Sequence, residues 1–282
     1  MTSRPVRIIT DSTADLPADV AQQLGIVTVP ISVNFGARTF LHGIDIDSPT
    51  FYQMLAGNNV HPTTSAPPPA WFKKIYAEQL DAGYDIVSVH LASTLSSMYD
   101  GAATAARQLR SDRIVVIDSG QLTLALGLLA QICARQAMAG VDLETLSQLA
   151  KGFVPRLRLA GILLDLDYVH RGGRISQTQA VIGTLLHIRG LFEVVEGDVR
   201  PAGRIRSMHR ALDKLIDLVA GWGPVESSVT IHANNPDLCQ QLERRLTKRG
   251  LSPGAGRFEG GPAVVTHVGP GAVGVAGILK PL

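Results

Sequence analysis

In the first half of the chain, short apolar runs alternate with segments whose apolar residues recur at helical spacing. The short runs predict strands because they hold many β-branched residues and end at turn residues. Strands are predicted at residues 6–10, 26–35, 85–91 and 113–118. Helices are predicted at residues 17–24, 48–57, 69–81, 97–109 and 122–139. This alternation predicts a mostly parallel sheet with helices on both of its faces.

In the second half of the chain, predicted strands and helices no longer alternate regularly. A helix is predicted at residues 143–154, and a buried strand follows at residues 161–166. Strands at 191–195 and 199–205 flank a Glu-Gly-Asp turn, which favours a hairpin. Strands are also predicted at 228–232 and 263–267, so that the last one ends at His267. One helical face gathers apolar side chains, namely Met208, Ala211, Leu212, Leu215, Ile216 and Val219.

The different patterns of the two halves predict an α/β protein of two domains, and a length of 282 residues is sufficient for two domains of ordinary size. We place the boundary near Arg156. This gives an N-terminal α/β domain over residues 1–155, with a mostly parallel sheet flanked by helices. The C-terminal α/β domain would cover residues 156–282 and have a mixed or antiparallel sheet.

Composition narrows the class of protein. The chain is 45 % hydrophobic, and its 26 basic and 24 acidic side chains leave a net charge of +2, which argues against nucleic acid as a partner. No apolar signal region precedes the first strand, and the longest apolar stretch, at 122–134, is too short to span a bilayer. Cys133 and Cys239 lie far apart in helical segments, so we expect reduced thiols in a soluble, cytoplasmic protein.

Three polar segments contain candidate anion ligands. Residues 11–15 (DSTAD) follow a predicted strand and could bind a ligand at the carboxyl edge of the sheet. Residues 93–97 (STLSS) also follow a strand, and there hydroxyls and free backbone N–H groups at a helix start can bind an anion. Plain helix capping is the alternative. Residues 61–69 (HPTTSAPPP) hold three hydroxyls in a loop that proline makes rigid. Such a loop suits recognition of an oxyanion, or it merely connects two elements.

Two pairs of arginines could also bind anions. Arg171 and Arg174 surround a glycine turn that could bind a phosphate or a protein partner, or lie in solvent. Arg204 and Arg206 end the predicted hairpin on one face of their strand. There a guanidinium could hold a carboxylate through two parallel hydrogen bonds, or be exposed without a function.

A histidine stands directly before a Gly-Pro-Gly turn. The imidazole of His267 suits holding a carboxylate or moving a proton, although a structural role is the alternative. Gly269 and Gly271 allow a backbone or a ligand to approach closely. The sequence has no Walker A motif, no Gly-x-Gly-x-x-Gly after a strand, no metal-ligand spacing and no nucleophile elbow. We therefore predict no metal, no cofactor and no catalytic residue.

Taken together and in this order, the polar segments resemble those of the DegV family, the bacterial fatty-acid-binding proteins that serve fatty acid kinase. The resemblance covers nearly the whole chain, and the ordered set is specific although each motif is short. The matching stretches are residues 10–16 (TDSTADL), 64–67 (TSAP), 93–96 (STLS), 118–119 (DS), 172–175 (GGRI), Arg206 and 267–271 (HVGPG).

The resemblance implies a Rossmann-like N-terminal domain, a C-terminal α/β domain and a long-chain fatty acid in a tunnel between them. The residues that it implies for the carboxylate are Thr64, Ser96, Arg206 and His267. The residues that would support this site are Ser65, Ser97, Gly269 and Gly271.

The chain departs from the family pattern at several positions. Ala66 replaces the usual Gln, Ser97 and Met98 replace Gly-Thr, Gly101 replaces a Ser, and Arg189-Gly190 stands where Lys-Pro is common. None of these changes removes a proposed carboxylate ligand. They bear on the shape of the head-group turn, the acyl preference and the choice of kinase.

Two functions are compatible with these residues. The first is a carrier without catalytic activity that takes a fatty acid from the membrane by transient surface contact. It presents the carboxylate to a separate ATP-dependent kinase, which forms an acyl phosphate, and Arg171 and Arg174 would dock that kinase. The alternative is a phosphotransfer or hydrolytic enzyme that uses His267 and Ser96 on a small carboxylate or phosphate substrate. The sequence leaves acyl chain length and oligomeric state open.

Overall fold

The computed structural model describes residues 4–57, 60–173, 188–251, 253–254 and 256–281. Its first half builds a four-stranded sheet in the order β2-β1-β6-β7, in which every neighbouring pair is parallel. The predicted parallel sheet is therefore confirmed. Its strands are β1 (Val6–Asp11), β2 (Val27–Val29), β6 (Asp85–His90) and β7 (Ile114–Asp118).

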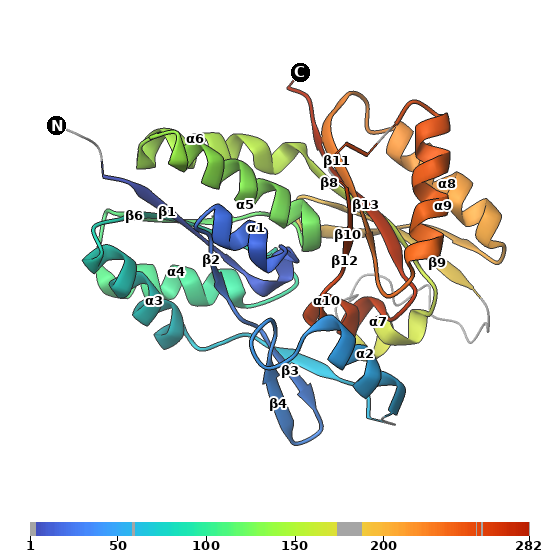
Figure 1. The fold of residues 1–282 in the computed structure, drawn as a ribbon, viewed down its shortest axis with the longest axis horizontal. Coiled ribbons are helices and arrows are strands. Elements are labelled where there is room, and N and C mark those ends of the chain that lie inside the picture. The colour runs from blue at the N-terminus through green and yellow to red at the C-terminus, as the bar shows by residue number, and fades with distance from the viewer. Residues whose placement is uncertain (1–3, 58–59, 174–187, 252, 255, 282) are drawn as a thin grey trace.

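Helices cover both faces of this sheet, α5 and α6 on one and α3 and α4 on the other (Figure 1). Helix α5 also contacts strands of the second large sheet, so it is buried on several sides and its first two turns are almost wholly apolar. The helical segments of this half are η1 (Ser12–Ala14), α1 (Ala18–Gln23), α3 (Pro69–Asp81), α4 (Met98–Leu109), α5 (Thr123–Met138), α6 (Leu143–Phe153) and η2 (Val154–Arg156).

A small antiparallel sheet, β4-β3-β5, extends below the first one in Figure 1. The strand region predicted over residues 26–35 contains two strands, because the chain passes there from one sheet to the other. Pro30 has no N–H for a ladder, and the N–H of Ile31 donates to the Ser12 hydroxyl at 3.0 Å instead. The elements of this region are β3 (Ser32–Phe35), β4 (Arg38–Leu41), α2 (Ser48–Gly57) and β5 (Thr63–Ser65).

The second half builds a mixed six-stranded sheet in the order β10-β9-β8-β13-β11-β12, with α8 and α9 on one face. Along β8, Ala160 and Ile162 join the core under these helices, while Leu157 and Leu159 join the core shared with the first half. The period of two thus directs alternate residues to two cores. The elements are β8 (Leu157–Leu163), α7 (Leu166–Gly172), β9 (Arg189–Val195), β10 (Asp198–Ile205), α8 (Met208–Ala220), β11 (Val225–His232), α9 (Pro236–Lys248), β12 (Arg257–Glu259), α10 (Pro262–Val268) and β13 (Val273–Leu279).

The sequence predictions differ from the structure at several places in this half. Residues 263–267, predicted as a strand, lie in helix α10. The buried strand predicted at 161–166 is β8, which begins at Leu157 and ends at Leu163. Helix α7 and strands β12 and β13 are elements that the sequence patterns did not identify. The patterns also set no bounds for helix α9, although the segment around Cys239 is predicted to be helical. The predicted hairpin and the apolar face of α8 are confirmed.

Two observations on the described segments concern the class of protein. None of their helices is long and apolar enough to cross a bilayer. Cys133 in α5 and Cys239 in α9 are buried free thiols, and burial raises the pKa of the Cys133 thiol to about 12. A thiol that is buried and protonated has little reactivity.

Candidate functional site

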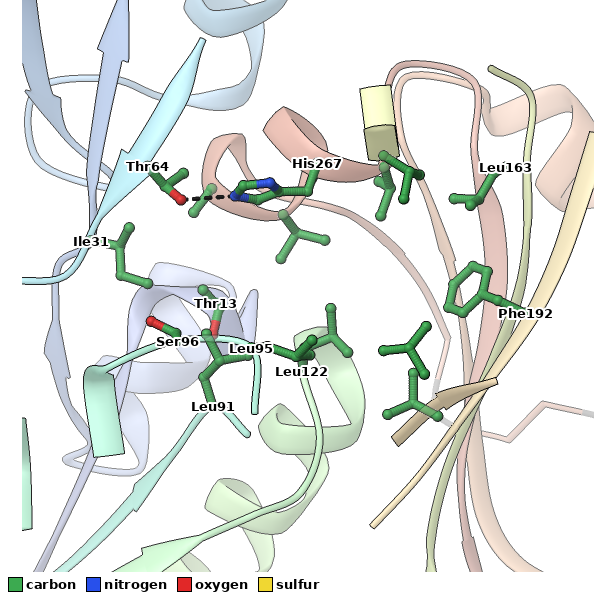
Figure 2. Close-up of a pocket in the computed structure, with 16 residues that line it drawn as sticks. Thr13, Ile31, Thr64, Leu91, Leu95, Ser96, Leu122, Leu163, Phe192 and His267 are labelled. Atoms are coloured by element: carbon green, nitrogen blue, oxygen red, sulfur yellow. Dashed lines mark hydrogen bonds between the residues drawn. The ribbon is translucent and has the colours of Figure 1, made fainter. Parts of the chain in front are cut away.

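A cavity of about 100 Å³ lies where the edge of the parallel sheet, the small sheet and α10 face strands of the second half. Most of its wall is apolar, including Ile31, Leu91, Leu95, Leu163 and Phe192 (Figure 2). The polar side chains on the wall are Thr13, Thr64, Ser96 and His267. In Figure 2 these four lie on the side of the cavity away from Phe192. The cavity thus has a polar end and an apolar end.

Strand alternation turns Thr64 toward this cavity. In β5, Thr64 is half-buried and pairs with Val33 of β3, while its neighbours Thr63 and Ser65 are exposed. The Thr64 hydroxyl shares a hydrogen bond of 2.8 Å with Nε2 of His267. Ser65, the predicted supporting residue, accepts a hydrogen bond from Nδ2 of Asn34 at 3.3 Å instead.

His267 lies in the last turn of helix α10, and its predicted place at a strand end is wrong. The β-branched run before it favours a strand, but Gly261 and Pro262 form a helix start that overrides this preference. The hydroxyl of Thr266 donates to the carbonyl of Pro262 at 2.8 Å, so that this buried side chain is satisfied within the helix. Gly269, at a φ of 77°, ends the helix.

Helix α7 packs against the His267 ring. A Cβ added to Gly172 of α7 would lie 2.5 Å from Nδ1 of His267, so only glycine leaves room for the ring there. A Cβ on Gly269 would lie 2.8 Å from the ring of Tyr168, and one on Gly271 would lie 2.5 Å from Leu164. The two glycines after His267 therefore pack closely against protein side chains, whereas the sequence predicted the approach of a backbone or a ligand.

The Ser-rich turn after β6 presents one hydroxyl to the cavity. Ser96 lines the wall, and its Oγ accepts a weak hydrogen bond of 3.4 Å from the N–H of Met98. Thr94 turns away and donates to the carbonyl of Gly197 at 2.5 Å, which joins this turn to the β9–β10 hairpin. Ser97 is exposed and makes no capping hydrogen bond.

A buried polar network holds the turns that carry Thr13 and Ser96. Asp11 accepts hydrogen bonds from the backbone N–H and the hydroxyl of Thr13 and, at 3.0 Å, from the N–H of Leu91. Nδ1 of His90 lies 3.0 Å from the same carboxylate. Because β1 and β6 are adjacent and parallel, Asp11 and His90 meet at their carboxyl ends. Two polar residues that each end a strand are the sequence signal for this network.

The network continues to Ser88, whose Oγ lies 2.7 Å from Nε2 of His90 and accepts from the Tyr76 hydroxyl at 2.8 Å. Ser88, His90 and Asp11 are thus hydrogen-bonded in the same order, serine to histidine to aspartate, as the catalytic triad of a serine hydrolase. All three are fully buried at 0 % exposure, and none of them lines the cavity. A substrate could not reach this serine, so the network holds the structure together.

A second buried carboxylate, Asp15, joins distant parts of the fold. It accepts from the Thr123 hydroxyl at 2.6 Å and from the N–H of Gly261 at 3.1 Å, so it ties the starts of α5 and α10 to the first turn. Burial raises the pKa of Asp15 to about 7, although both hydrogen bonds oppose that rise. Burial lowers the pKa of the nearby His42 to about 4.

The remaining predicted residues lie elsewhere. Arg206 is exposed just after β10 and lines a separate surface hollow, so the structure does not bring it to Thr64, Ser96 and His267. Arg171 is exposed at the end of α7, and Arg174 lies outside the described residues. Within the described ranges, no group of His, Cys, Asp or Glu has the arrangement of a metal site.

Comparison with known proteins agrees with this fold. The family model for uncharacterised proteins of the DegV family matches residues 5–280. A DegV domain-containing protein of Streptomyces coelicolor is 34 % identical over 280 residues, which is 97 % of this chain and 98 % of that protein. One of Caldanaerobacter subterraneus is 30 % identical over 273 residues, or 96 % and 97 % of the two chains.

Solved structures extend the likeness to three dimensions. A DegV family protein of Thermus thermophilus, described by its fatty acid binding, has a TM-score of 0.90 at 26 % identity and covers 98 % of this chain and 100 % of its own. DegV of Bacillus subtilis, described as a fatty acid binding protein, has a TM-score of 0.86 at 29 % identity, with 99 % and 100 % covered. The resemblance seen in the sequence is thereby confirmed. Since the family model and these relatives match along nearly the entire length, this chain belongs to the DegV family.

Proposed function

We propose that this protein binds a long-chain fatty acid, with the carboxylate at Thr64, Ser96 and His267 and the acyl chain along the apolar wall. The observation that supports this most strongly is the two-ended cavity, in which polar side chains gather at one end only (Figure 2). The fatty acid binding named for relatives from Thermus thermophilus and Bacillus subtilis points the same way.

The energetics suit a carrier. Burying about 15 methylenes at roughly 0.8 kcal/mol each gives on the order of 12 kcal/mol of gross driving force. The head group then needs only to avoid an unpaired buried charge and to fix which end of the ligand faces outward. The hydroxyls of Thr64 and Ser96 can donate to a carboxylate, and His267 can do so through either protonation state of its ring.

The second part of the proposal is a division of labour. The carrier presents the carboxylate to a separate ATP-dependent kinase, which forms the acyl phosphate, and has no catalytic residue, metal or cofactor of its own. The absence of any phosphate-binding motif from the sequence motivates this part. Purified protein should neither bind nor hydrolyse ATP, yet its bound fatty acid should become phosphorylated when the kinase is added. ATP turnover by the protein alone would favour the enzymatic alternative.

Arg171 is the candidate for docking the kinase. Its guanidinium is exposed at the end of α7, next to Gly172, which contacts the His267 ring. A partner that meets this helix end would therefore stand close to the head group. Arg174, the second predicted docking residue, lies outside the described residues and is kept as part of this proposal.

Transient contact with a membrane surface would use a basic hollow that includes Arg204, Arg206, Arg210 and Lys214. None of these four side chains pairs with a carboxylate in the described part of the chain. An anionic lipid surface attracts such clusters. Binding to phosphatidylglycerol vesicles should fall in the double variant Arg204→Glu/Arg210→Glu but not in Arg107→Glu, a charge reversal on α4. Equal vesicle binding by both would remove this part of the proposal.

The experiment that tests the main proposal is mass spectrometry of an organic extract from the purified protein. We expect one long-chain fatty acid per protein molecule. An extract without lipid, from protein that also takes up no added fatty acid, would contradict fatty acid binding.

A further inference from the structure

Asp15 lies where three segments that line the cavity meet, although its own side chain is not part of the wall. Thr13 of η1 stands two residues before Asp15 and lines the cavity. Leu122, also on the wall, directly precedes Thr123, whose hydroxyl donates to Oδ2 of Asp15. Gly261, whose N–H donates to Oδ1, is the residue before helix α10, the third segment of the wall. One carboxylate thus holds all three segments.

Helix α10 depends on this carboxylate for its start. The helix has seven residues, and a helix this short is not stable without tertiary contacts. Its N-cap residue, Gly261, has no side chain that could accept a hydrogen bond from the helix. Asp15 accepts the N–H of Gly261 from 246 positions away in the chain, and its negative charge suits a helix N-terminus. His267 lies in the last turn of the same helix, so a shift of the start would move its ring.

The backbone on both sides of one of these hydrogen bonds is strained. Asp15 has a φ of 49° and Thr123 a φ of 48°, in the left-handed region that β-branched residues such as Thr rarely adopt. Both residues are buried, and the bond of 2.6 Å joins them directly. Strain of this kind persists only where the surrounding structure holds it, and it gathers at functional sites. The pair therefore indicates a functional constraint on this turn.

The start of α10 also has no free space beside Asp15. A Cβ added to Gly261 would lie 2.8 Å from Oδ1 of Asp15 and 2.4 Å from Nε2 of His42. Close packing of this kind fixes the backbone of the helix start relative to the turn after β1. The position of α10 is therefore set at Asp15 at one end and at the contact between Gly172 and His267 at the other.

We propose that Asp15 is a positioning residue for the fatty acid head group, which holds the start of α10 and so keeps His267 beside Thr64. In Figure 2, His267 and Thr13 reach the cavity from two of the segments that Asp15 joins. This inference rests on the proposed fatty acid binding. Without the carboxylate, fewer unliganded molecules would have the site formed, and the apparent affinity would fall by the same factor.

The test compares hexadecanoate binding by Asp15→Ala and Asp142→Ala. Asp142 is the matched control, because it also accepts from a backbone N–H and a Thr hydroxyl, at the start of α6, and does not line the cavity. Affinity should fall about tenfold in Asp15→Ala, which loses two hydrogen bonds to a charged acceptor. Asp142→Ala should bind like the wild type. Asp15→Asn, which keeps an acceptor for the N–H of Gly261, should restore most of the affinity.

NMR spectra of the unliganded proteins separate positioning from a general loss of stability. In Asp15→Ala the ring resonances of His267 should shift, whereas those of His209, an exposed residue of α8, should not. Asp142→Ala should shift neither set. Melting temperatures show that each variant is folded under the conditions of the measurement.

The outcomes separate this inference from the proposed function. Wild-type affinity and unchanged His267 resonances in folded Asp15→Ala would overturn the inference and leave fatty acid binding intact. If the wild type binds no fatty acid, the proposed function fails and the inference with it. Should Asp15→Ala not fold, Thr123→Val takes its place, since it removes one of the two hydrogen bonds. Equal affinities of Thr123→Val and Thr123→Ser would then overturn the inference.

Discussion

At the residue scale, the hydrogen bond between Thr64 and His267 joins two residues that are 203 positions apart. Both were predicted as carboxylate ligands from short motifs, and the structure places them together with Ser96. The resemblance of the ordered motifs to those of the DegV family implied that role for both residues. Arg206 shows the limit of such predictions. Strand alternation predicts on which face of the strand a side chain lies, but not which part of the folded protein that face is next to, and Arg206 lies in a separate surface hollow.

The first prediction concerns Thr64→Val, which keeps the shape of the side chain and removes its hydroxyl. Fatty acid affinity should fall about tenfold, because the variant loses one hydrogen-bond donor and leaves His267 without this partner. Titration with a fluorescent fatty acid measures the change. Thr64→Ser should stay near the wild type, and Thr63→Val on the exposed side of the strand should have no effect. A similar loss in Thr63→Val would mean that the strand, not the hydroxyl, is responsible.

The second prediction ranks two substitutions. Ser96→Ala should weaken fatty acid binding more than Arg206→Ala, because Ser96 lines the cavity while Arg206 is exposed in the separate basic hollow. A charge-assisted pair would be about twice as strong as a neutral hydrogen bond, so the reverse order would place Arg206 at the carboxylate after all. The same titration decides, with melting temperatures to show that both variants fold.

At the element scale, helix α10 shows why the sequence patterns predicted the wrong secondary structure next to His267, a residue that lines the cavity. The run from Ala263 to Val265 is apolar and β-branched, which favours a strand in isolation. The run is buried throughout, so either element could have placed it in the core. The local signals that favour a helix over a strand are Gly261 and Pro262 before the run and Gly269 after it. The parallel sheet was predictable because its βα alternation repeats several times, whereas α10 stands alone.

Our third prediction uses the contact between α7 and α10. Gly172→Ala should reduce fatty acid affinity by tenfold or more, because the new Cβ would displace the His267 ring. Gly152→Ala in α6 is the matched control, since a Cβ there meets nothing within 4 Å. Helix propensity alone favours Ala by about 1 kcal/mol in both variants. Unchanged affinity in Gly172→Ala would show that the ring has another position available.

At the scale of the whole molecule, both buried carboxylates connect parts of the chain that no sequence pattern linked. Asp11 ends a strand and Asp15 follows at a φ of 49°, and both were read only as parts of a polar turn. Their partners at His90, Thr123 and Gly261 are set by the tertiary fold. Long-range contacts of this kind depend on how elements pack, which is why the sequence did not reveal them.

The fourth prediction is a pH dependence that Asp15 causes. Its pKa of about 7 lies above the ordinary value of 3.8. The stability that it contributes is therefore full below that ordinary value and is lost as the pH rises toward 7. Compared with Asp15→Asn, the wild type should lose on the order of 4 kcal/mol in free energy of unfolding across this range.

Denaturant titrations of both proteins at pH 4, 5, 6 and 7 measure that difference. His42 acts in the opposite sense, because its lowered pKa of about 4 makes the folded state less stable as the pH falls. It is present in both proteins, so its contribution cancels to first order. A constant difference between the wild type and Asp15→Asn would show that the Asp15 carboxyl titrates normally.

The cavity wall comes from both halves of the chain, with Ile31 and Leu91 from the first half and Leu163 and Phe192 from the second. A ligand held there would act as a non-covalent cross-link, and the folded state would gain about 2.7 kcal/mol when free ligand is at 100 times its dissociation constant. Empty protein would open more often and offer cleavage sites to proteases. The lifetime of this protein in a cell would then follow the supply of its own cargo.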